Sequence, residues 1–397
     1  MDPATGGPCQ GIRNSVPDLK RIGLRNEIVC LDDPSSVFLN EDLCEIHALG
    51  VGKGPWKYNS KLVPWLLKNL HRFDVVIMHG LWLYPSYAIT KAMKIFKKEA
   101  SKNKTKALHI PKLFIMPHGM LDPYFQKDPG RKLKALRNCV YWKLVERNVI
   151  NNADGLLFTC QEELQLAREP FSPYRPKREI NVGYGIKTPP VFSAKMAQAF
   201  LKVCPNIKSN AYFLFLSRIH DKKGVDLLVE AYSSQLKKEI KKGNIFPKLV
   251  IAGPGIESSY GKKILKFINE TPDLKEHIKF PGLLLGDAKW GAYYGCEAFI
   301  LPSHQENFGI VVAEALACGK PVLISDKVNI WREIKKDAAG IITTDTLIGV
   351  EKLFQNWQLL PNEEKLSMGS NAVRLFKKNF TSEAAAKRLK QVFITNE

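Results

Sequence analysis

Short apolar runs alternate with longer amphipathic segments along most of the chain. Runs of this length predict buried strands, and apolar residues spaced three and four apart predict the helices that cover them. In the first half, the predicted strands are 27–31, 75–79, 112–116 and 155–159. The predicted helices there are 61–70, 85–100, 133–153 and 162–167. This alternation predicts an α/β fold with a doubly wound parallel sheet.

The alternation is interrupted once and then returns. Glycines and prolines in 183–190 prevent a regular element, so we place the connection between two domains there. The strands predicted beyond it are 211–216, 249–252 and 298–302, and the helices are 260–269, 308–317 and 382–394. Because 397 residues exceed what one hydrophobic core usually spans, two domains are expected. We predict them at 1–190 and 191–380, followed by a C-terminal helix within 381–397.

Composition narrows the class of protein. With 45% hydrophobic residues the chain has ample material for two cores. The eight cysteines contain no C-x-x-C pair, which favours a reducing compartment over a disulfide framework or a zinc site. The polar start does not resemble a signal peptide, and no apolar stretch is long enough to span a bilayer. We therefore expect a cytoplasmic protein.

The segment 303–322, S-H-Q-E-N-F-G-I-V-V-A-E-A-L-A-C-G-K-P-V, carries the most informative chemistry. It follows a predicted strand and opens a helix, which places Glu306 in the loop and Glu314 about two turns into the helix. The first backbone N–H groups of a helix have no partner inside it, so they attract phosphate at the ligand-binding edge of a parallel sheet. These amides belong to Phe308, Gly309 and Ile310. Together the groups predict a phosphate and sugar pocket.

A pair of cations follows the predicted strand 211–216. Arg218 and Lys223 lie in S-R-I-H-D-K-K-G, directly after this strand. A guanidinium can hold a diphosphate as a rigid fork and an ammonium can hold it as a point charge, which together could replace a metal ion. The alternative is that both are ordinary surface cations of a basic protein. A weaker signal is Gly253, in the G-P-G turn that ends the strand 249–252.

The spacing of these residues resembles the signature of the retaining glycosyltransferases of family 4. That family shows two glutamates separated by seven residues, with Phe-Gly after the first, and Glu306 to Glu314 matches each of these positions. The resemblance implies the GT-B architecture, in which two Rossmann-like domains face each other across a cleft and a C-terminal helix crosses back to the first domain. It also implies that Arg218 and Lys223 bind the donor diphosphate. Glu306 would bind the donor sugar, Glu314 the ribose, and the Gly253 turn would lie beside the base.

In the first domain the resemblance points to two loops. His118, in M-P-H-G after the strand 112–116, resembles the family's cleft histidine near the donor sugar. An imidazole at a strand end can form hydrogen bonds in either protonation state near neutral pH. The loop with Gly6 and Gly7 resembles the one that approaches the donor diphosphate. Family members have an apolar strand just before this loop, so we expect the N-terminal domain to lack its first strand.

The charge balance predicts an anionic partner. The formal net charge is +20 and the isoelectric point is near 9.5. Two segments concentrate cations, 91–106 and 131–150, and the second interleaves them with apolar residues at helical spacing, as in helices that rest on anionic lipid. A solvated basic face over a packed apolar stripe is the alternative. No arrangement resembles a nucleic-acid module, so we predict no nucleic-acid partner.

We therefore predict the transfer of a hexosyl unit from a nucleotide-diphosphate sugar to an acceptor hydroxyl with retained configuration. His118, Glu306, Arg218 and Lys223 are the predicted catalytic residues. The acceptor would be lipid-linked or part of a polysaccharide or glycolipid, as for many enzymes resembling this one. No D-x-D run occurs, so we expect no essential metal and no cofactor beyond the donor. A sugar-nucleotide epimerase, a glycogen-type synthase and a non-catalytic, basic membrane-associated protein stay open as alternatives.

Overall fold

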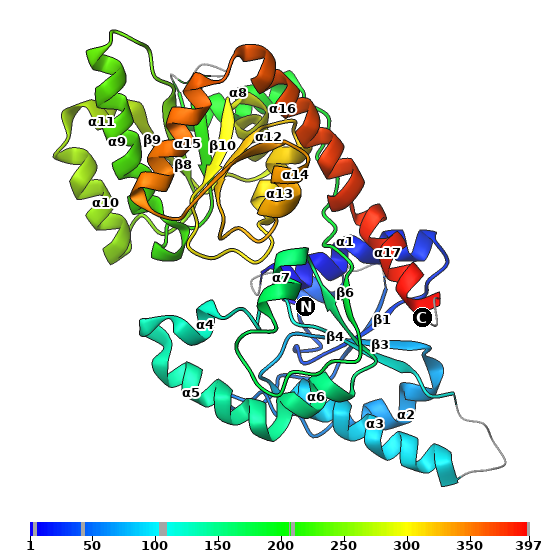
Figure 1. Ribbon diagram of the computed structural model, residues 1–397. Helices are drawn as coiled ribbons and strands as arrows, with labels where there is room; N and C mark the ends of the chain where they lie inside the picture. The colour runs from blue at the N-terminus through cyan, green and yellow to red at the C-terminus, as the bar shows by residue number, and fades with distance from the viewer. Residues whose placement is uncertain (3–5, 41–43, 103–108, 206, 208–210, 395–397) are drawn as a thin grey trace. The chain divides into compact units, whose positions relative to one another are not determined.

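The computed structural model describes residues 1–2, 6–40, 44–102, 109–205, 207 and 211–394. The chain divides into two compact units, and Figure 1 shows both. Met1–Gly185 and Ser382–Glu397 form the N-terminal unit, and Ile186–Thr381 form the C-terminal unit. Among the described residues, each helix is too short or too polar to cross a membrane.

The C-terminal unit is built on one six-stranded parallel sheet. Its order is β12-β11-β10-β7-β8-β9. The strands are β7 (Tyr212–Leu216), β8 (Lys248–Ala252), β9 (Ile278–Gly282), β10 (Ala298–Leu301), β11 (Val322–Ser325) and β12 (Gly340–Thr343). The strand order runs in one direction from β7 to β9 and in the other from β10 to β12, so the topological switch point lies between β7 and β10. Parallel α/β sheets bind ligands outside the carboxyl ends of their strands at this point.

Helices supply the apolar surfaces that cover this sheet. They are α8 (Ala194–Val203), α9 (Val225–Lys241), α10 (Ser259–Asn269), α11 (Pro272–His277), α12 (Gly286–Gly295), α13 (Ile310–Ala317), α14 (Trp331–Lys336), α15 (Leu347–Leu359) and α16 (Asn362–Leu375). Buried aromatic rings lock the sheet to two of them: Phe213 on β7 packs 5.2 Å from Phe354 on α15, and Tyr232 on α9 packs 5.8 Å from the same ring. Because such rings bury large apolar areas, the strand ends above them are held firmly.

The described residues of the N-terminal unit form two separate parallel sheets. One has the order β3-β4-β5-β6, and the other pairs β1 with β2. The strands are β1 (Glu27–Cys30), β2 (Glu45–Ala48), β3 (Val75–His79), β4 (Lys112–Met116), β5 (Gly155–Phe158) and β6 (Glu179–Asn181). The first element among the described residues is a helix, α1 (Gly7–Arg21), and residues 3–5 of the expected donor loop lie outside them.

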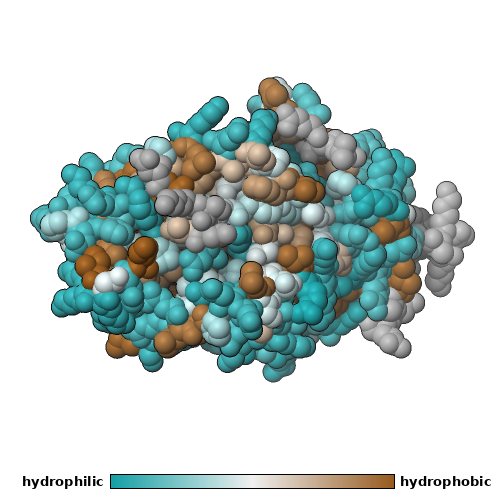
Figure 2. Space-filling view, turned by 90° about the horizontal axis from the view of Figure 1, so that it is seen from above, coloured by the Kyte–Doolittle hydropathy of each residue, from teal (hydrophilic) through white to brown (hydrophobic). Residues whose placement is uncertain are grey.

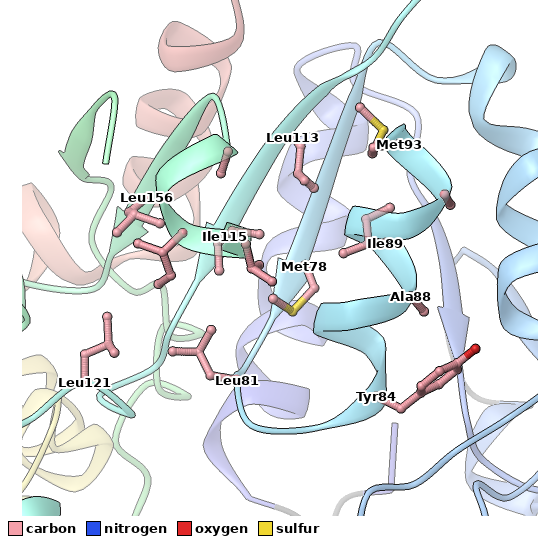
Figure 3. Packing of buried hydrophobic residues seen from close by; sticks show 14 of the residues in the cluster. Met78, Leu81, Tyr84, Ala88, Ile89, Met93, Leu113, Ile115, Leu121 and Leu156 are labelled. Atoms are coloured by element: carbon pink, nitrogen blue, oxygen red, sulfur yellow. The ribbon is translucent and has the colours of Figure 1, made fainter. Parts of the chain in front are cut away.

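Further helices cover both sheets of this unit. They are α2 (Leu62–Asn69), α3 (Tyr84–Lys102), α4 (Tyr124–Lys127), α5 (Lys132–Tyr141), the π-helical turn η5 (Trp142–Glu146), α6 (Arg147–Asn152), α7 (Gln161–Leu166) and α17 (Ser382–Ile394). Figure 3 shows the main core, where Met78 and Ile115 from neighbouring strands face Ile89 of α3. The C-terminal helix α17 lies beside α1 in Figure 1, and its Leu389 packs with Leu19 in a second cluster.

The predicted α/β class with parallel sheets is confirmed, and most predicted strands match the observed ones within a residue or two. The prediction missed α1, whose Pro17 and low hydropathy conceal a helix, and five short strands, β2, β6, β9, β11 and β12. The predicted helix 308–317 begins later, because Gly309 takes a left-handed φ of 78° and α13 starts after it. Glu314 therefore lies one turn into the helix and not two.

Candidate functional site

The two loops beside the switch point of the C-terminal sheet are bound to each other. The loop after β7 contains Lys223, and the loop after β10 contains Glu306; the Lys223 ammonium forms an ion pair with the Glu306 carboxylate. The backbone N–H of His304 donates to the Lys222 carbonyl oxygen at 2.9 Å. Gly224 takes a φ of 64°, and a Cβ there would lie 2.3 Å from the Pro302 carbonyl oxygen. Only glycine allows this close approach of the two loops.

The ion pair is partly withdrawn from water. Lys223 keeps 7% of its surface exposed, and the Glu306 side chain keeps 22%. The backbone on both sides of Glu306 is fixed by the loop after β11: its N–H donates to the Lys327 carbonyl at 2.9 Å, and its carbonyl accepts from the Asn329 N–H at 3.0 Å. A desolvated ammonium can bind a phosphate oxygen, and the carboxylate beside it can accept a hydrogen bond from a sugar hydroxyl.

Arg218 lies on the same loop as Lys223, two residues after β7 ends. Its side chain is exposed and has no hydrogen bond or ion pair with any described residue. The Gly253 turn holds the backbone on either side of it: Ser217 N–H donates to the Ala252 carbonyl at 3.0 Å, and Ile219 N–H donates to the Pro254 carbonyl at 2.8 Å. These bonds fix the backbone of Arg218 at the switch point, while its guanidinium has no partner among the described residues.

Gly253 itself is required by this contact. It adopts a φ of 141°, and a Cβ at this position would lie 1.9 Å from the Ser217 carbonyl oxygen. A side chain would force the β8 turn away from the strand end that carries Arg218. The structure thus gives a steric reason for glycine at this position, and its role in donor binding stays a prediction.

The N-terminus of α13 adds backbone donors beside Glu306. Gly309 is its N-cap residue and provides no side-chain cap, so the first N–H groups of the helix, from Ile310 on, are not capped by it. A Cβ on Gly309 would lie 3.4 Å from Cγ of Glu306, which places this helix start next to that carboxylate. Phe308 points inward instead, 4% exposed and 5.4 Å from the Phe380 ring. The helix start can therefore stabilise an anion near Glu306.

Glu314, inside α13, is held by two donors from α12. The Lys289 ammonium lies 2.7 Å from Oε1, and the Tyr293 hydroxyl donates to Oε2 at 3.0 Å. Burial first, and then the nearby carboxylate, raise the pKa of Tyr293 well above its usual value, so the phenol stays a donor. Neither partner could be predicted from the sequence, since nothing near Lys289 in the sequence links it to Glu314.

In the N-terminal unit, two histidines meet at neighbouring strand ends. His79 ends β3 and His118 lies two residues past β4, with its Nε2 2.9 Å from Nδ1 of His79. One imidazole must donate to the other, because protonating both would place two cations in contact. The His79 side chain is exposed at the surface and that of His118 is half-buried. Desolvation by the surrounding protein lowers the pKa of both imidazoles, and His79 lowers that of His118 further. At neutral pH this is an uncharged hydrogen-bonding pair.

Buried carboxylates hold both histidine loops in left-handed backbone conformations. After β4, His118 has a φ of 53° and Gly119 one of 78°. Glu163, 3% exposed on α7, accepts from the Gly119 N–H at 2.5 Å and from the Thr159 N–H at 2.7 Å. The Thr159 hydroxyl donates to the same carboxylate at 2.5 Å. A φ in this region is costly for histidine, and these bonds offset the cost.

The loop after β3 is held in the same way. Trp82 has a φ of 72°, and its N–H donates to Oε1 of the fully buried Glu146 at 2.6 Å. Burial raises the pKa of Glu146 to about 7. Sequence reasoning missed Glu146 and Glu163. Glu163 does stand three residues after the N-cap Cys160, where a glutamate is typical of a helix start, but this pattern gives no hint of its contact with Gly119.

Gly6 and Gly7, the other predicted donor residues of this unit, lie at the start of α1. Gly6 is the N-cap residue with a φ of 91°, and the Gly7 carbonyl accepts from the Tyr184 hydroxyl at 2.5 Å. Contacts join Lys223, Glu306 and Gly309 at one place and join the Gly253 turn to the backbone beside Arg218. Phe308, Ile310 and Glu314 belong to the same C-terminal unit, while Gly6, Gly7 and His118 belong to the N-terminal unit.

One group among the described residues could offer three metal ligands. Glu27, Glu45 and His47, on β1 and β2, have ligand atoms within 4.8 Å of one another. The Arg72 guanidinium lies 2.6 Å from Glu27, however, and already neutralises that carboxylate. The group shares no residue with the motifs above, and it does not change the interpretation of the site.

Comparison with known proteins agrees with this architecture. Residues 200–365 match the family described as glycosyl transferases group 1, and residues 6–183 match the glycosyl transferase 4-like domain. The uncharacterized glycosyltransferase MJ1607 of Methanocaldococcus jannaschii is 30% identical over 149 residues, which cover 36% of each chain. A D-inositol 3-phosphate glycosyltransferase of Kribbella flavida is 28% identical over 204 residues, 50% of this chain and 46% of that protein. The matched region thus spans less than half the length of either relative.

Solved structures resemble nearly the whole chain. Anabaena Alr3699/HepE in complex with UDP and glucose has a TM-score of 0.69 at 16% identity, over 98% of this chain and 96% of that one. Sucrose-phosphate synthase from Thermosynechococcus elongatus has a TM-score of 0.66 at 17% identity, over 98% and 93%. At these identities the likeness shows the fold alone. It defines this protein as one with the GT-B fold.

The two family matches together extend over most of the chain, and both describe glycosyl transferases. The chain belongs to the family 4 glycosyltransferases of the GT-B fold. The resemblance seen in the sequence is thereby confirmed.

Proposed function

We propose that this protein transfers a hexosyl unit from a nucleotide-diphosphate sugar to an acceptor hydroxyl with retention of the anomeric configuration. The observation that supports this most directly is the ion pair of Lys223 with Glu306 at the switch point, beside the start of α13. An ammonium, backbone donors and a carboxylate at one place match the needs of a sugar bound through a diphosphate.

The proposed mechanism is stabilisation of the leaving group. As the bond from the anomeric carbon to the bridging oxygen breaks, negative charge grows on the nucleotide diphosphate. Arg218, Lys223 and the first N–H groups of α13 stabilise this charge, and the partial exclusion of water around Lys223 strengthens the interaction. Because these groups already supply positive charge, the proposal needs no metal ion.

The remaining residues orient the substrates. Glu306 accepts hydrogen bonds from hydroxyls of the donor sugar, and Glu314 accepts them from the ribose while Lys289 and Tyr293 fix its carboxylate. The neutral pair of His118 and His79 forms hydrogen bonds with the sugar or the acceptor. We assign no covalent nucleophile, because the resemblance to family 4 assigns Glu306 to the sugar hydroxyls and Glu314 to the ribose, whereas a nucleophilic pair would have to flank the anomeric carbon.

Two finer points of the proposal come from similarity. Anabaena HepE was solved with UDP and glucose, so a uridine diphosphate hexose is the first donor to test. The acceptor is proposed to be lipid-linked, or part of a polysaccharide or glycolipid, as the resemblance to family 4 suggests.

The test combines donor binding with turnover. UDP-, GDP- and ADP-sugars are screened for a rise in melting temperature, and the radiolabelled donor that binds is then followed for transfer, hydrolysis or isomerisation. We expect transfer, a product of unchanged anomeric configuration by proton NMR, and full activity in EDTA. Isomerisation would identify an epimerase, polymer growth from glucose units a glycogen-type synthase, and the absence of donor binding would refute the proposal.

Variants connect that result to the site. Arg218→Ala should weaken the melting-temperature response to the donor and slow transfer, because the diphosphate loses its fork of donors. The control is Lys237→Ala, which removes an exposed cation from α9. Equal loss in both variants would indicate a nonspecific charge effect and contradict the assigned site.

A further inference from the structure

The segment α5–η5 presents an apolar stripe to solvent. Four side chains spaced three or four residues apart lie on its outer face, and they are highly exposed: Leu133 at 85%, Leu136 at 64%, Val140 at 52% and Leu144 at 72%. The stripe is about 17 Å long at the rise of a helix. Single exposed leucines are ordinary, but a continuous row on one helix face marks an interaction surface.

The packing of the inner face fixes this orientation. Trp142 is 1% exposed and stacks on Phe171 with ring centroids 4.9 Å apart. Asn138 and Glu146, on the same side, are also buried, and Glu146 holds the Trp82 N–H. The segment cannot rotate its leucines into the core without breaking these contacts. The exposure of the stripe is therefore a stable feature of the fold.

The exposed charged residues that border the stripe are all positive. Between residues 129 and 147 the only carboxylate is Glu146, which is buried, and the basic residues are Arg131, Lys132, Lys134, Arg137, Lys143 and Arg147. A second copy of this chain would bring the same cations against one another, which disfavours self-association. An anionic bilayer offers negative charge to the border and an apolar layer to the leucines.

The other basic segment, 91–106, does not expose an apolar stripe among its described residues. On α3, the cations Lys91, Lys94, Lys97, Lys98 and Lys102 are exposed. The apolar residues of that helix, such as Ile89, Met93 and Phe96, are buried in the core instead. Helix α3 therefore presents a solvated basic face. Lys104 and Lys106 of the same segment lie outside the described residues. Charge alone does not distinguish the two segments, but exposure of apolar side chains does.

We propose that the outer face of α5–η5 docks onto anionic lipid, with Leu133, Leu136, Val140 and Leu144 inserted among the headgroups and the flanking cations on the phosphates. This surface lies outside the candidate donor site, so the proposal stands independently of the proposed function. It also assigns membrane contact to the segment 131–150 and not to 91–106.

The test is cosedimentation with vesicles of phosphatidylcholine alone and of phosphatidylcholine mixed with phosphatidylglycerol. The wild-type chain should bind the mixed vesicles far better. Leu136→Ser/Leu144→Ser leaves the charge unchanged and should reduce binding about tenfold. Lys134→Glu/Lys143→Glu should reduce it at least as much. All these residues are exposed, so unchanged thermal unfolding is expected to show that each variant folds.

A charge-matched control decides between docking and general attraction. Lys94→Glu/Lys98→Glu makes the same charge change on α3 and should alter binding less than about twofold. Equal losses in both charge variants, with no effect of the serine variant, would overturn the proposal. So would a dimer in sedimentation velocity that the serine variant dissociates, because the stripe would then bind a second copy.

Discussion

In the C-terminal unit, the ends of β7 and β10 bring a cation and a carboxylate into contact, whereas in the N-terminal unit the ends of β3 and β4 bring two imidazoles together. The first pair is charged, and the short loops that carry it are bound directly to each other. The second pair is neutral at pH 7, and its loops are held in left-handed conformations by carboxylates from other helices.

This difference suggests a division of labour in the proposed reaction. Charged groups suit the diphosphate, whose charge increases as the donor bond breaks. Neutral donors and acceptors suit sugar hydroxyls, because they form hydrogen bonds without adding a charge near the reacting carbon. The carboxyl edge of a parallel sheet can therefore be equipped for either task, depending on the contacts that hold the loops at that edge.

The largest effect is expected at the charged pair. Lys223→Ala should lower transfer about 1,000-fold, since one preorganised donor to the leaving group is lost. It should also lower the free energy of unfolding by about 1–3 kcal/mol, because Glu306 loses its partner. Initial rates and thermal melts measure the two effects. Lys223→Ala/Glu306→Ala should regain part of the stability but no activity. A single variant that keeps wild-type turnover would remove the charged pair from the mechanism.

The next effect concerns the turn that supports Arg218. Gly253→Ala should destabilise the C-terminal unit by about 3 kcal/mol, because the new Cβ would collide with the Ser217 carbonyl oxygen. Chemical denaturation measures this change. Gly243→Ala is the matched control, since Gly243 also has a positive φ, of 74°, but no atom within 4 Å of its Cβ position. If both variants lost the same stability, the backbone angle and not the contact would be responsible.

A smaller effect tests the neutral pair through its support. Glu163→Gln replaces one acceptor oxygen by a donor that faces the N–H or hydroxyl groups of Gly119 and Thr159. The His118 loop should shift, and kcat should fall about 100-fold with a smaller change in KM. Glu163→Asp should restore part of kcat, because it keeps the carboxylate. Glu169→Gln, an exposed carboxylate beyond α7, is the control. Unchanged kcat in Glu163→Gln would show that the hydrogen bonds of Glu163 contribute to stability alone.

The smallest effect is a pH dependence of stability in the N-terminal unit. Burial raises the pKa of Glu146 from 4.5 to about 7. Between these values the native carboxyl holds a proton that the unfolded chain has lost, so its contribution to stability is present below pH 4.5 and is lost as the pH rises through 7. Glu146→Gln should therefore stabilise the protein by about 2 kcal/mol near pH 6 and hardly at all near pH 4. Thermal melts at both ends of this range measure the difference, and an equal shift at both would contradict the raised pKa.

The candidate site of the C-terminal unit could be predicted because its parts are local in sequence. Arg218, Lys223, Gly253 and the segment from Glu306 to Glu314 each lie within a few residues of a strand end, and the apolar runs reveal those strands. Parallel pairing then brings the strand ends to one edge of the sheet. The start of α13 was predicted less well, because the left-handed Gly309 delays the helix and the packing of Phe308 is not visible in the pattern.

Local sequence patterns were enough to predict the family, the alternation of strands and helices, and the residues of the candidate donor site. Three features become visible only in the folded chain: His79 contacts His118, Glu146 and Glu163 hold the loops of these histidines, and α5, unlike α3, exposes apolar side chains to solvent. The two kinds of feature differ in how far apart in the sequence the residues that specify them lie. A strand or a helix start is specified by neighbouring residues, whereas the partner of a buried carboxylate or the exposed side of an amphipathic helix depends on which surfaces the folded chain brings together.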